Sequence, residues 1–161
     1  MVNIEFKIEQ QVASMDVLVP LIKERLAAGQ SVRFSPKGIS MLPMLREGID
    51  TVTLSAITDT VRKYDVLLFQ RDDGKYVLHR VISVGETYTF IGDNQFNKER
   101  GIRKDQLISI VTSFTRNGKD ISVHSFLYKL YCVFWCSTRF PRRVLRAIHN
   151  RTMRFFRRGE R

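Results

Sequence analysis

Residues 64–92 of this 161-residue chain read YDVLLFQRDDGKYVLHRVISVGETYTFIG, and they decide the fold class. Segments rich in Val, Leu, Ile, Phe and Tyr alternate here with short polar stretches, as β-strands alternate with turns. The strand-like segments are 64–70, 75–84 and 87–92. Asp73-Gly74 predicts a tight hairpin turn between the first two segments, because glycine accepts the positive φ that such a turn needs.

The same strand pattern continues on both sides of this stretch. Further strand-like segments are SVRFSP at 31–36, TVTLSA at 51–56 and LISIVTSF at 107–114. Turn signals at 46–48 and at Asn117-Gly118 separate some of them. Many short strands at close spacing predict a mainly β fold, a compact antiparallel β-barrel-like domain over residues 31–122.

The first segment of the chain, residues 1–30, predicts one amphipathic helix over residues 14–28. Apolar side chains follow helical spacing at Val17, Leu18, Leu21, Ile22 and Leu26. Asp16 can cap the start of this helix, so that Pro20 falls in the first turn, where its missing N–H costs nothing. Gly29 predicts the end of the helix.

The last segment, residues 123–161, predicts an aromatic and arginine-rich helical tail. The net charge of the chain is +11, and nine arginines with a single acidic residue lie between residues 139 and 161. Beyond Pro141, apolar side chains share one helical face and arginines surround it, as in a basic amphipathic helix. The expected partner is an anionic membrane surface, although an arginine-rich tail can also serve only solubility. The contacting residues would be Arg142, Arg143, Arg146, Arg151, Arg154, Phe155, Phe156, Arg157 and Arg158.

The expected location is cytoplasmic, with peripheral attachment to a membrane through residues 126–161. The N-terminus has neither a basic n-region nor an apolar h-region, which excludes a secretory signal. The longest apolar run, at 126–136, contains Lys129 and falls short of the roughly 20 residues that span a bilayer. Nucleic acid is not an expected partner, because the sequence has no recognisable nucleic-acid motif.

The segment 38–45, GISMLPML, is the first candidate for chemistry. A serine on a tight turn, preceded by Gly38 and followed by Pro43, can be held rigid with its hydroxyl exposed. Backbone N–H groups around such a turn can converge on one point and stabilise an oxyanion. Ser40 is therefore a candidate nucleophile, and an ordinary turn serine is the alternative.

His79 and Asp93 are the candidate partners of this serine. A serine hydroxyl needs an adjacent base, and His79, in the middle of a predicted strand, can supply it. Asp93, in the Gly-Asp-Asn sequence at 92–94, can orient a histidine as in a Ser-His-Asp triad. A structural histidine and a simple turn are the alternatives. His124 and His149 are expected to be structural or at the surface.

No metal and no cofactor are expected. Cys132 and Cys136 lie together in an apolar stretch without nearby Cys or His partners, which argues against a zinc site. Four residues apart on a helix, they are expected to pack as small apolar groups.

Three short motifs in this order resemble those of a known family. Ser-Met-x-Pro at 40–43, His-Arg-Val at 79–81 and Gly-Asp-Asn at 92–94 resemble the type I signal peptidases of the endoplasmic-reticulum and archaeal kind. In these serine peptidases, histidine replaces the lysine base of most bacterial members. The LexA-like self-cleaving repressors belong to the same superfamily. The resemblance covers about residues 31–115, and it implies the fold shared by signal peptidases and LexA.

The resemblance implies a role for each matching residue. Ser40 would be the nucleophile and His79 the general base, and the motif's acid falls on Asp93. The family has a second important Asp before an Arg-Gly pair, where this chain has Glu99. Which of the two carboxylates orients the histidine is left open. The oxyanion turn would comprise Gly38, Ile39 and Met41, with Gly38 where signal peptidases often have a hydroxyl residue.

The sequence thus predicts a serine endopeptidase of the signal-peptidase type, acting through an acyl-enzyme. Its substrate would be a peptide or protein segment that docks as an extended strand. One alternative is an inactive or complex-dependent peptide-binding member of the same fold. The other alternative is a basic membrane-surface binding protein. The sequence leaves open the substrate, the cleavage site and the oligomeric state. It also leaves open whether the enzyme cleaves itself or cleaves other chains in trans.

Overall fold

One sheet organises the part of the chain that this computed structural model describes, residues 5–7, 14–145 and 147–148. Its strands are β1 (Glu5–Lys7), β2 (Ser31–Phe34), β3 (Val52–Ser55), β4 (Val66–Gln70), β5 (Tyr76–Val84), β6 (Tyr88–Ile91), β7 (Glu99–Ile102), β8 (Leu107–Arg116) and β9 (Lys119–Ser122). A short 3₁₀ turn, Lys104–Gln106, precedes β8. The helices are α1 (Met15–Ala27) and α2 (Phe126–Ser137).

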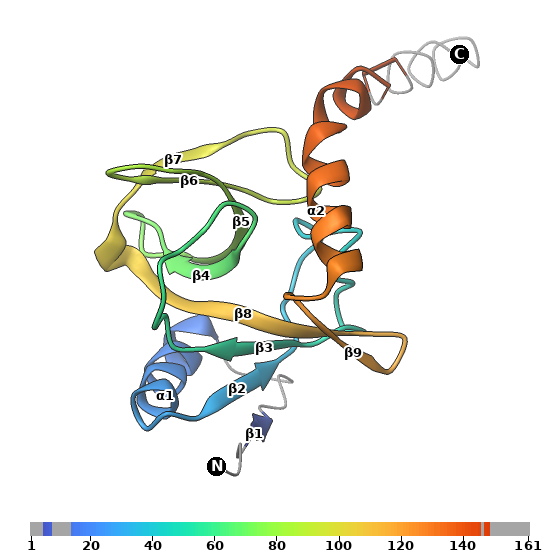
Figure 1. Cartoon of the computed structure of the whole chain (residues 1–161). Helices are drawn as coiled ribbons and strands as arrows, with labels where there is room; N and C mark the ends of the chain where they lie inside the picture. Colours follow the sequence, from blue (N-terminus) through green and yellow to red (C-terminus); the bar gives the residue numbers. More distant parts are fainter. Residues whose placement is uncertain (1–4, 8–13, 146, 149–161) are drawn as a thin grey trace, which may run out of the picture.

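The strand order is β1-β2-β3-β8-β4-β5-β6-β7, and β9 pairs with β8 (Figure 1). Every pair is antiparallel except β1 with β2, which is parallel. The hairpin predicted at Asp73-Gly74 is confirmed: β4 and β5 pair from Gln70↔Tyr76 to Val66↔Arg80. Gly74 has the positive φ that the turn needs, +81°.

The mainly antiparallel β fold with an N-terminal helix is confirmed, but the barrel-like form is not. Among the described strands, β1 and β7 end the order and do not pair with each other, so the sheet is not closed. β1, β7 and β9 were not predicted from the sequence, since each has only three or four residues and little apolar alternation.

Helix α1 packs on the sheet through the buried side chains Leu18, Val19, Ile22 and Leu26. It begins one residue after Ser14, earlier than a cap at Asp16 predicts. Pro20 therefore lies inside the helix and not in its first turn, and Val17, expected on the apolar face, is exposed. Gly29, with a φ of +75°, ends the helix as predicted.

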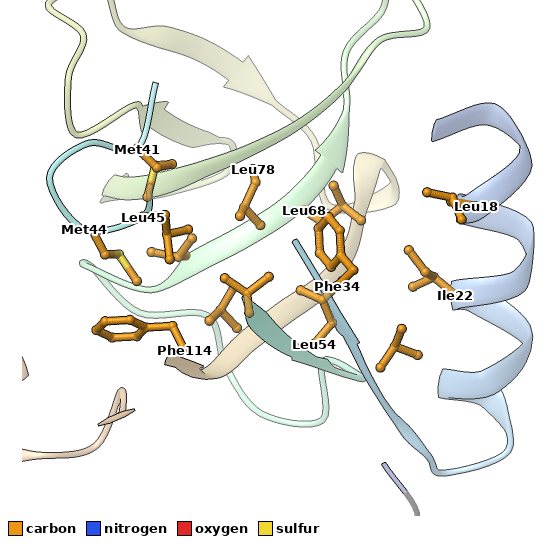
Figure 2. Packing of buried hydrophobic residues seen from close by; sticks show 14 of the residues in the cluster. Leu18, Ile22, Phe34, Met41, Met44, Leu45, Leu54, Leu68, Leu78 and Phe114 are labelled. Carbon is orange, nitrogen blue, oxygen red and sulfur yellow. The ribbon is translucent and has the colours of Figure 1, made fainter. Parts of the chain in front are cut away.

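The sheet has apolar residues on both faces. The larger cluster joins α1, β2, β3, β8, α2 and the loop at 38–45, and Figure 2 shows Met41, Met44 and Leu45 of that loop beside Leu78 and Phe114. The smaller cluster comprises Val61, Leu67, Phe69, Val81, Phe90 and Ile102. The loop at 38–45 is thus part of the main core and is held in place by it.

Helix α2 follows β9 and is capped by Ser125, whose side chain accepts a hydrogen bond from the Tyr128 N–H. The helical path breaks at Thr138, because Pro141 has no N–H to donate to the Ser137 carbonyl. Residues 139–145 and 147–148 are again helical. None of the helices within the described residues is long and apolar enough to cross a membrane.

Most of the predicted membrane-contact residues lie beyond what the structure describes. Arg142 and Arg143 are within the described residues. Those outside them are Arg146, Arg151, Arg154, Phe155, Phe156, Arg157 and Arg158.

Candidate active site

Ser40 lies in the loop that leads from β2 toward β3, on a turn held by the core. Met41, Met44 and Leu45, which follow Ser40 in the loop, are buried, whereas Ser40 itself is half-buried. Its hydroxyl makes no hydrogen bond with any residue that the structure describes. The core therefore fixes the backbone of the turn and leaves the hydroxyl available.

The residues predicted to form the oxyanion turn surround Ser40 as expected for a short turn. Gly38 has a φ of +91°, a left-handed conformation that residues with a side chain rarely adopt. Ile39 is exposed and Met41 is buried, so the chain passes from solvent into the core at Ser40. The backbone conformation therefore explains the glycine at position 38. Lack of space does not explain it, because no atom lies within 4 Å of the position that a Cβ would take.

A buried carboxylate closes the far end of the same loop. Asp50 accepts hydrogen bonds from the Arg46 backbone N–H at 2.9 Å and from its guanidinium at 2.7 and 2.9 Å, and Arg116 lies 3.1 Å away. The Arg46 side chain is the main cause that lowers the pKa of Asp50, against the opposing effect of burial. Arg116 also donates to the Pro43 carbonyl at 2.8 Å, which ties β8 to the loop.

His79 is buried in the middle of β5, and Glu99 at the start of β7 contacts it. Nδ1 of His79 lies 2.6 Å from Oε1 of Glu99. The two residues come from strands on either side of β6, and the pairing of β5, β6 and β7 brings them together. A carboxylate beside Nδ1 favours the tautomer that carries its proton on Nδ1 and leaves Nε2 free to accept one.

Arg71 holds Glu99 from the other side. Its Nε and Nη2 donate to the two carboxylate oxygens of Glu99 at 2.5 and 2.7 Å, the bidentate geometry that arginine favours. Burial by itself would raise the pKa of Glu99, but the close approach of His79 and the hydrogen bonds from Arg71 outweigh it and lower the pKa to about 2. Glu99 is thus an anion near neutral pH. Sequence reasoning missed Arg71, whose only signal was a basic residue at the end of a strand.

Because Gly92 has no side chain, Ser40 and His79 can both lie close to its backbone. A Cβ atom at this position would lie 2.7 Å from the Ser40 carbonyl oxygen and 3.0 Å from Nε2 of His79. Glycine is required here for space, because both groups approach the same backbone. Glu99 thus lies on the Nδ1 side of the imidazole, and the backbone of Ser40 lies on the Nε2 side.

Asp93 does not contact His79. It accepts two hydrogen bonds of 2.7 Å from Nε and Nη2 of Arg80, and both side chains are fully buried. Tyr131 donates to the same carboxylate at 3.2 Å, and the Trp135 indole N–H donates to the Asp93 carbonyl at 3.0 Å. Of the two acids that the sequence left open, Glu99 therefore lies against the histidine, and Asp93 joins β5 to α2.

Asn94 fixes the loop that carries Ser40 directly. Its backbone N–H donates to the Ser40 carbonyl at 2.8 Å, and its side-chain amide donates to the Ile39 carbonyl at 3.2 Å. The three residues of the Gly-Asp-Asn motif thus act differently: Gly92 leaves space, Asp93 neutralises Arg80, and Asn94 holds the turn.

A pocket of ≈ 240 Å³ opens beside Ser40 and His79. Residues 36–38, before the serine, and residues 76–79 of β5 line this pocket. Gln95 also lines it. Among the described strands, residues 76–79 of β5 pair with β4 on one side only, because the pairing with β6 begins at Arg80, so their other edge is open to an extended segment.

Nothing in the described residues groups three His, Cys, Asp or Glu side chains as a metal site would require. Cys132 is buried and Cys136 is half-buried, and both are free thiols whose pKa burial raises. Cys132 packs against Arg80, whose Nη1 lies 3.0 Å from its sulfur.

No protein-family model matches this chain, and no curated protein matches its sequence.

Proposed function

We propose that this protein is a serine endopeptidase of the signal-peptidase type, with Ser40 as the nucleophile and His79 as the general base. The observation that carries the proposal is the order of groups around the imidazole. Glu99 lies against Nδ1, and the backbone of Ser40 approaches the Nε2 side. A base oriented by a carboxylate on one nitrogen and open to a serine on the other is the arrangement that acyl transfer needs.

The proposed reaction proceeds through an acyl-enzyme. Ser40 Oγ bonds to the substrate carbonyl carbon while Nε2 of His79 takes the hydroxyl proton. His79 then gives that proton to the leaving amine as the C–N bond breaks, and water hydrolyses the ester by the reverse roles. Ionised Glu99 stabilises the imidazolium in both steps. Backbone N–H groups of the turn at Gly38–Met41 would hold the oxyanion.

The proposed substrate is a peptide segment in extended conformation. Residues 76–79 of β5, whose edge away from β4 has no paired strand among the described residues, line the pocket beside Ser40 and His79. An extended segment along this edge can use main-chain hydrogen bonds for affinity, whatever its sequence. This favours a polypeptide substrate over a compact small molecule.

Cleavage of a mixed peptide library, followed by mass spectrometry, tests this function. Ser40→Ala and His79→Ala should each abolish cleavage, and the double variant should be little worse than either, because the two residues act as a unit. Ser83→Ala and His124→Ala change exposed residues of the same types and should cleave normally. Undiminished cleavage by Ser40→Ala would disprove the mechanism.

A second candidate function keeps the peptide site without the reaction. It is favoured by the free hydroxyl of Ser40, which makes no hydrogen bond to His79 among the described residues. A peptide-binding or complex-dependent member of the fold would bind library peptides equally well in wild type and Ser40→Ala and would cleave none. Covalent labelling of Ser40 by a serine-reactive phosphonate separates the two, since only the peptidase has an activated hydroxyl.

A further inference from the structure

The outer face of α2 carries a continuous stripe of exposed apolar side chains. The stripe residues are Phe126, Leu127, Leu130, Val133 and Phe134, with exposed fractions of 77%, 77%, 55%, 48% and 62%. Their spacing of one, three and four residues puts them on one side of the helix. Soluble monomers rarely expose such a contiguous apolar patch unless it contacts something.

The fold of this protein does not account for the stripe. Helix α2 already packs on the domain through its other face, where Tyr128 and Cys132 are buried and Tyr131 and Trp135 bond to Asp93. Figure 1 shows α2 at the edge of the molecule, with the sheet on one side of it. The stripe thus faces away from the core.

Basic charge accompanies the stripe. No acidic residue occurs between Asp120 and Glu160, whereas the same segment carries Lys129 and most of the arginines of the tail. After the break at Thr138 the helical path exposes further apolar side chains: Phe140, Val144, Leu145 and Ile148. Arg143 is exposed among them, while Arg142 turns back onto the Trp135 ring, 3.5 Å from its centroid.

We propose that the α2 stripe docks on the surface of an anionic lipid bilayer. An apolar face whose own segment carries basic and no acidic residues matches a surface whose interior is apolar and whose headgroups are negative. A second copy of this chain fits the same face poorly, because a symmetric contact would bring two basic segments together. The sequence alone predicted attachment through residues 126–161 as a whole. The structure adds a distinct, ordered apolar element that is fixed to the catalytic domain and needs no part of residues 149–161.

Flotation of the full-length protein with vesicles tests the proposal. Phosphatidylcholine vesicles with and without phosphatidylglycerol are used at low and high salt. Wild type should float with the anionic vesicles and detach as salt rises. Leu127→Glu and Phe134→Glu place an acid on the stripe and should each reduce binding by about tenfold or more. Both side chains are exposed, so the fold should persist, and circular dichroism checks this.

Two further variants make the test specific. Leu127→Ser and Phe134→Ser remove apolar surface without adding charge and should also weaken binding. Val17→Glu adds the same charge to an apolar residue of α1 that is 65% exposed, and it should bind as wild type does. The proposal is overturned if the stripe variants float like wild type, which would leave the tail alone as the binding element. A concentration-dependent dimer that Leu127→Glu abolishes, without flotation, would also overturn it in favour of a second copy.

Discussion

Glu99 contacts two side chains, Arg71 and His79, and its role toward each is different. Arg71 holds both carboxylate oxygens, and one of these oxygens also contacts His79. The arginine fixes the position of the carboxylate, and the remaining interaction orients the imidazole. Because its pKa is about 2, Glu99 keeps its charge over the whole range in which a histidine titrates.

We expect Glu99→Gln to lower kcat/KM by about 100-fold, because the imidazolium that forms during the reaction loses the anion that stabilises it. The measurement is kcat/KM against pH on a cleaved library peptide. Glu86→Gln, at an exposed turn, is the matched control. A Glu99→Gln profile that superimposes on wild type would remove Glu99 from the mechanism.

Gly92→Ala tests whether Ser40 and His79 meet across this residue. The added methyl would lie 2.7 Å from the Ser40 carbonyl oxygen, so the loop or the base must move. We expect activity to fall by about 100-fold and the free energy of unfolding to fall by about 1–3 kcal/mol. Gly85→Ala is the control, since its methyl would meet nothing closer than 3.7 Å. Equal activity of the two variants would contradict the proposed geometry.

At the scale of elements, β5 connects the candidate site to α2. His79 lines the site, and the next residue, Arg80, is fully buried and contacts partners from other elements. These partners are Asp93, Tyr64, Tyr128, Cys132 and Met44. Adjacent residues of one strand thus hold the histidine and contact the helix, so a shift of α2 would also displace His79.

Asp93→Asn should destabilise the protein by about 3 kcal/mol, because it leaves the charge of Arg80 buried without its counter-ion. Urea unfolding measures the effect. Asp120→Asn breaks an exposed ion pair with Arg33 and should cost less than about 1 kcal/mol. If both substitutions cost the same, the buried pair does not hold α2 on the sheet.

At the scale of the whole molecule, two carboxylates with lowered pKa values join distant parts of the sheet. Asp50 connects the loop that carries Ser40 to β8 through Arg116, and Glu99 connects β7 to the end of β4 through Arg71. Both are more acidic in the folded protein than in the unfolded chain. Their stabilisation is therefore complete above the unfolded pKa values and is lost as pH falls through the folded ones.

We accordingly expect the free energy of unfolding to decrease as pH falls from about 5 toward 2, since the unfolded state binds these protons first. Urea midpoints measured across this range give the slope. Asp50→Asn and Glu99→Gln should each lower stability at neutral pH and flatten the slope below pH 5. Glu86→Gln should leave the slope as in wild type. An unchanged slope in both site variants would show that other groups control acid unfolding.

Local patterns were enough to predict much of this protein. Alternating apolar residues and the Asp73-Gly74 turn predicted the central hairpin, and helical spacing with Gly29 predicted α1, because backbone preference and side-chain periodicity act over a few residues. Ser40 and His79 could be chosen as candidates from residue chemistry and motif order. Their meeting in one pocket could not be derived from spacing.

Only the tertiary structure decided which acid meets the histidine. Asp93 and Glu99 both follow β6 within a few residues, and the pairing of β7 with β6 brings Glu99 to the imidazole while Asp93 turns to Arg80. The open sheet, the space reserved at Gly92 and the apolar stripe of α2 likewise depend on contacts between residues far apart in the chain. Such contacts follow from strand order and packing, which no local pattern specifies.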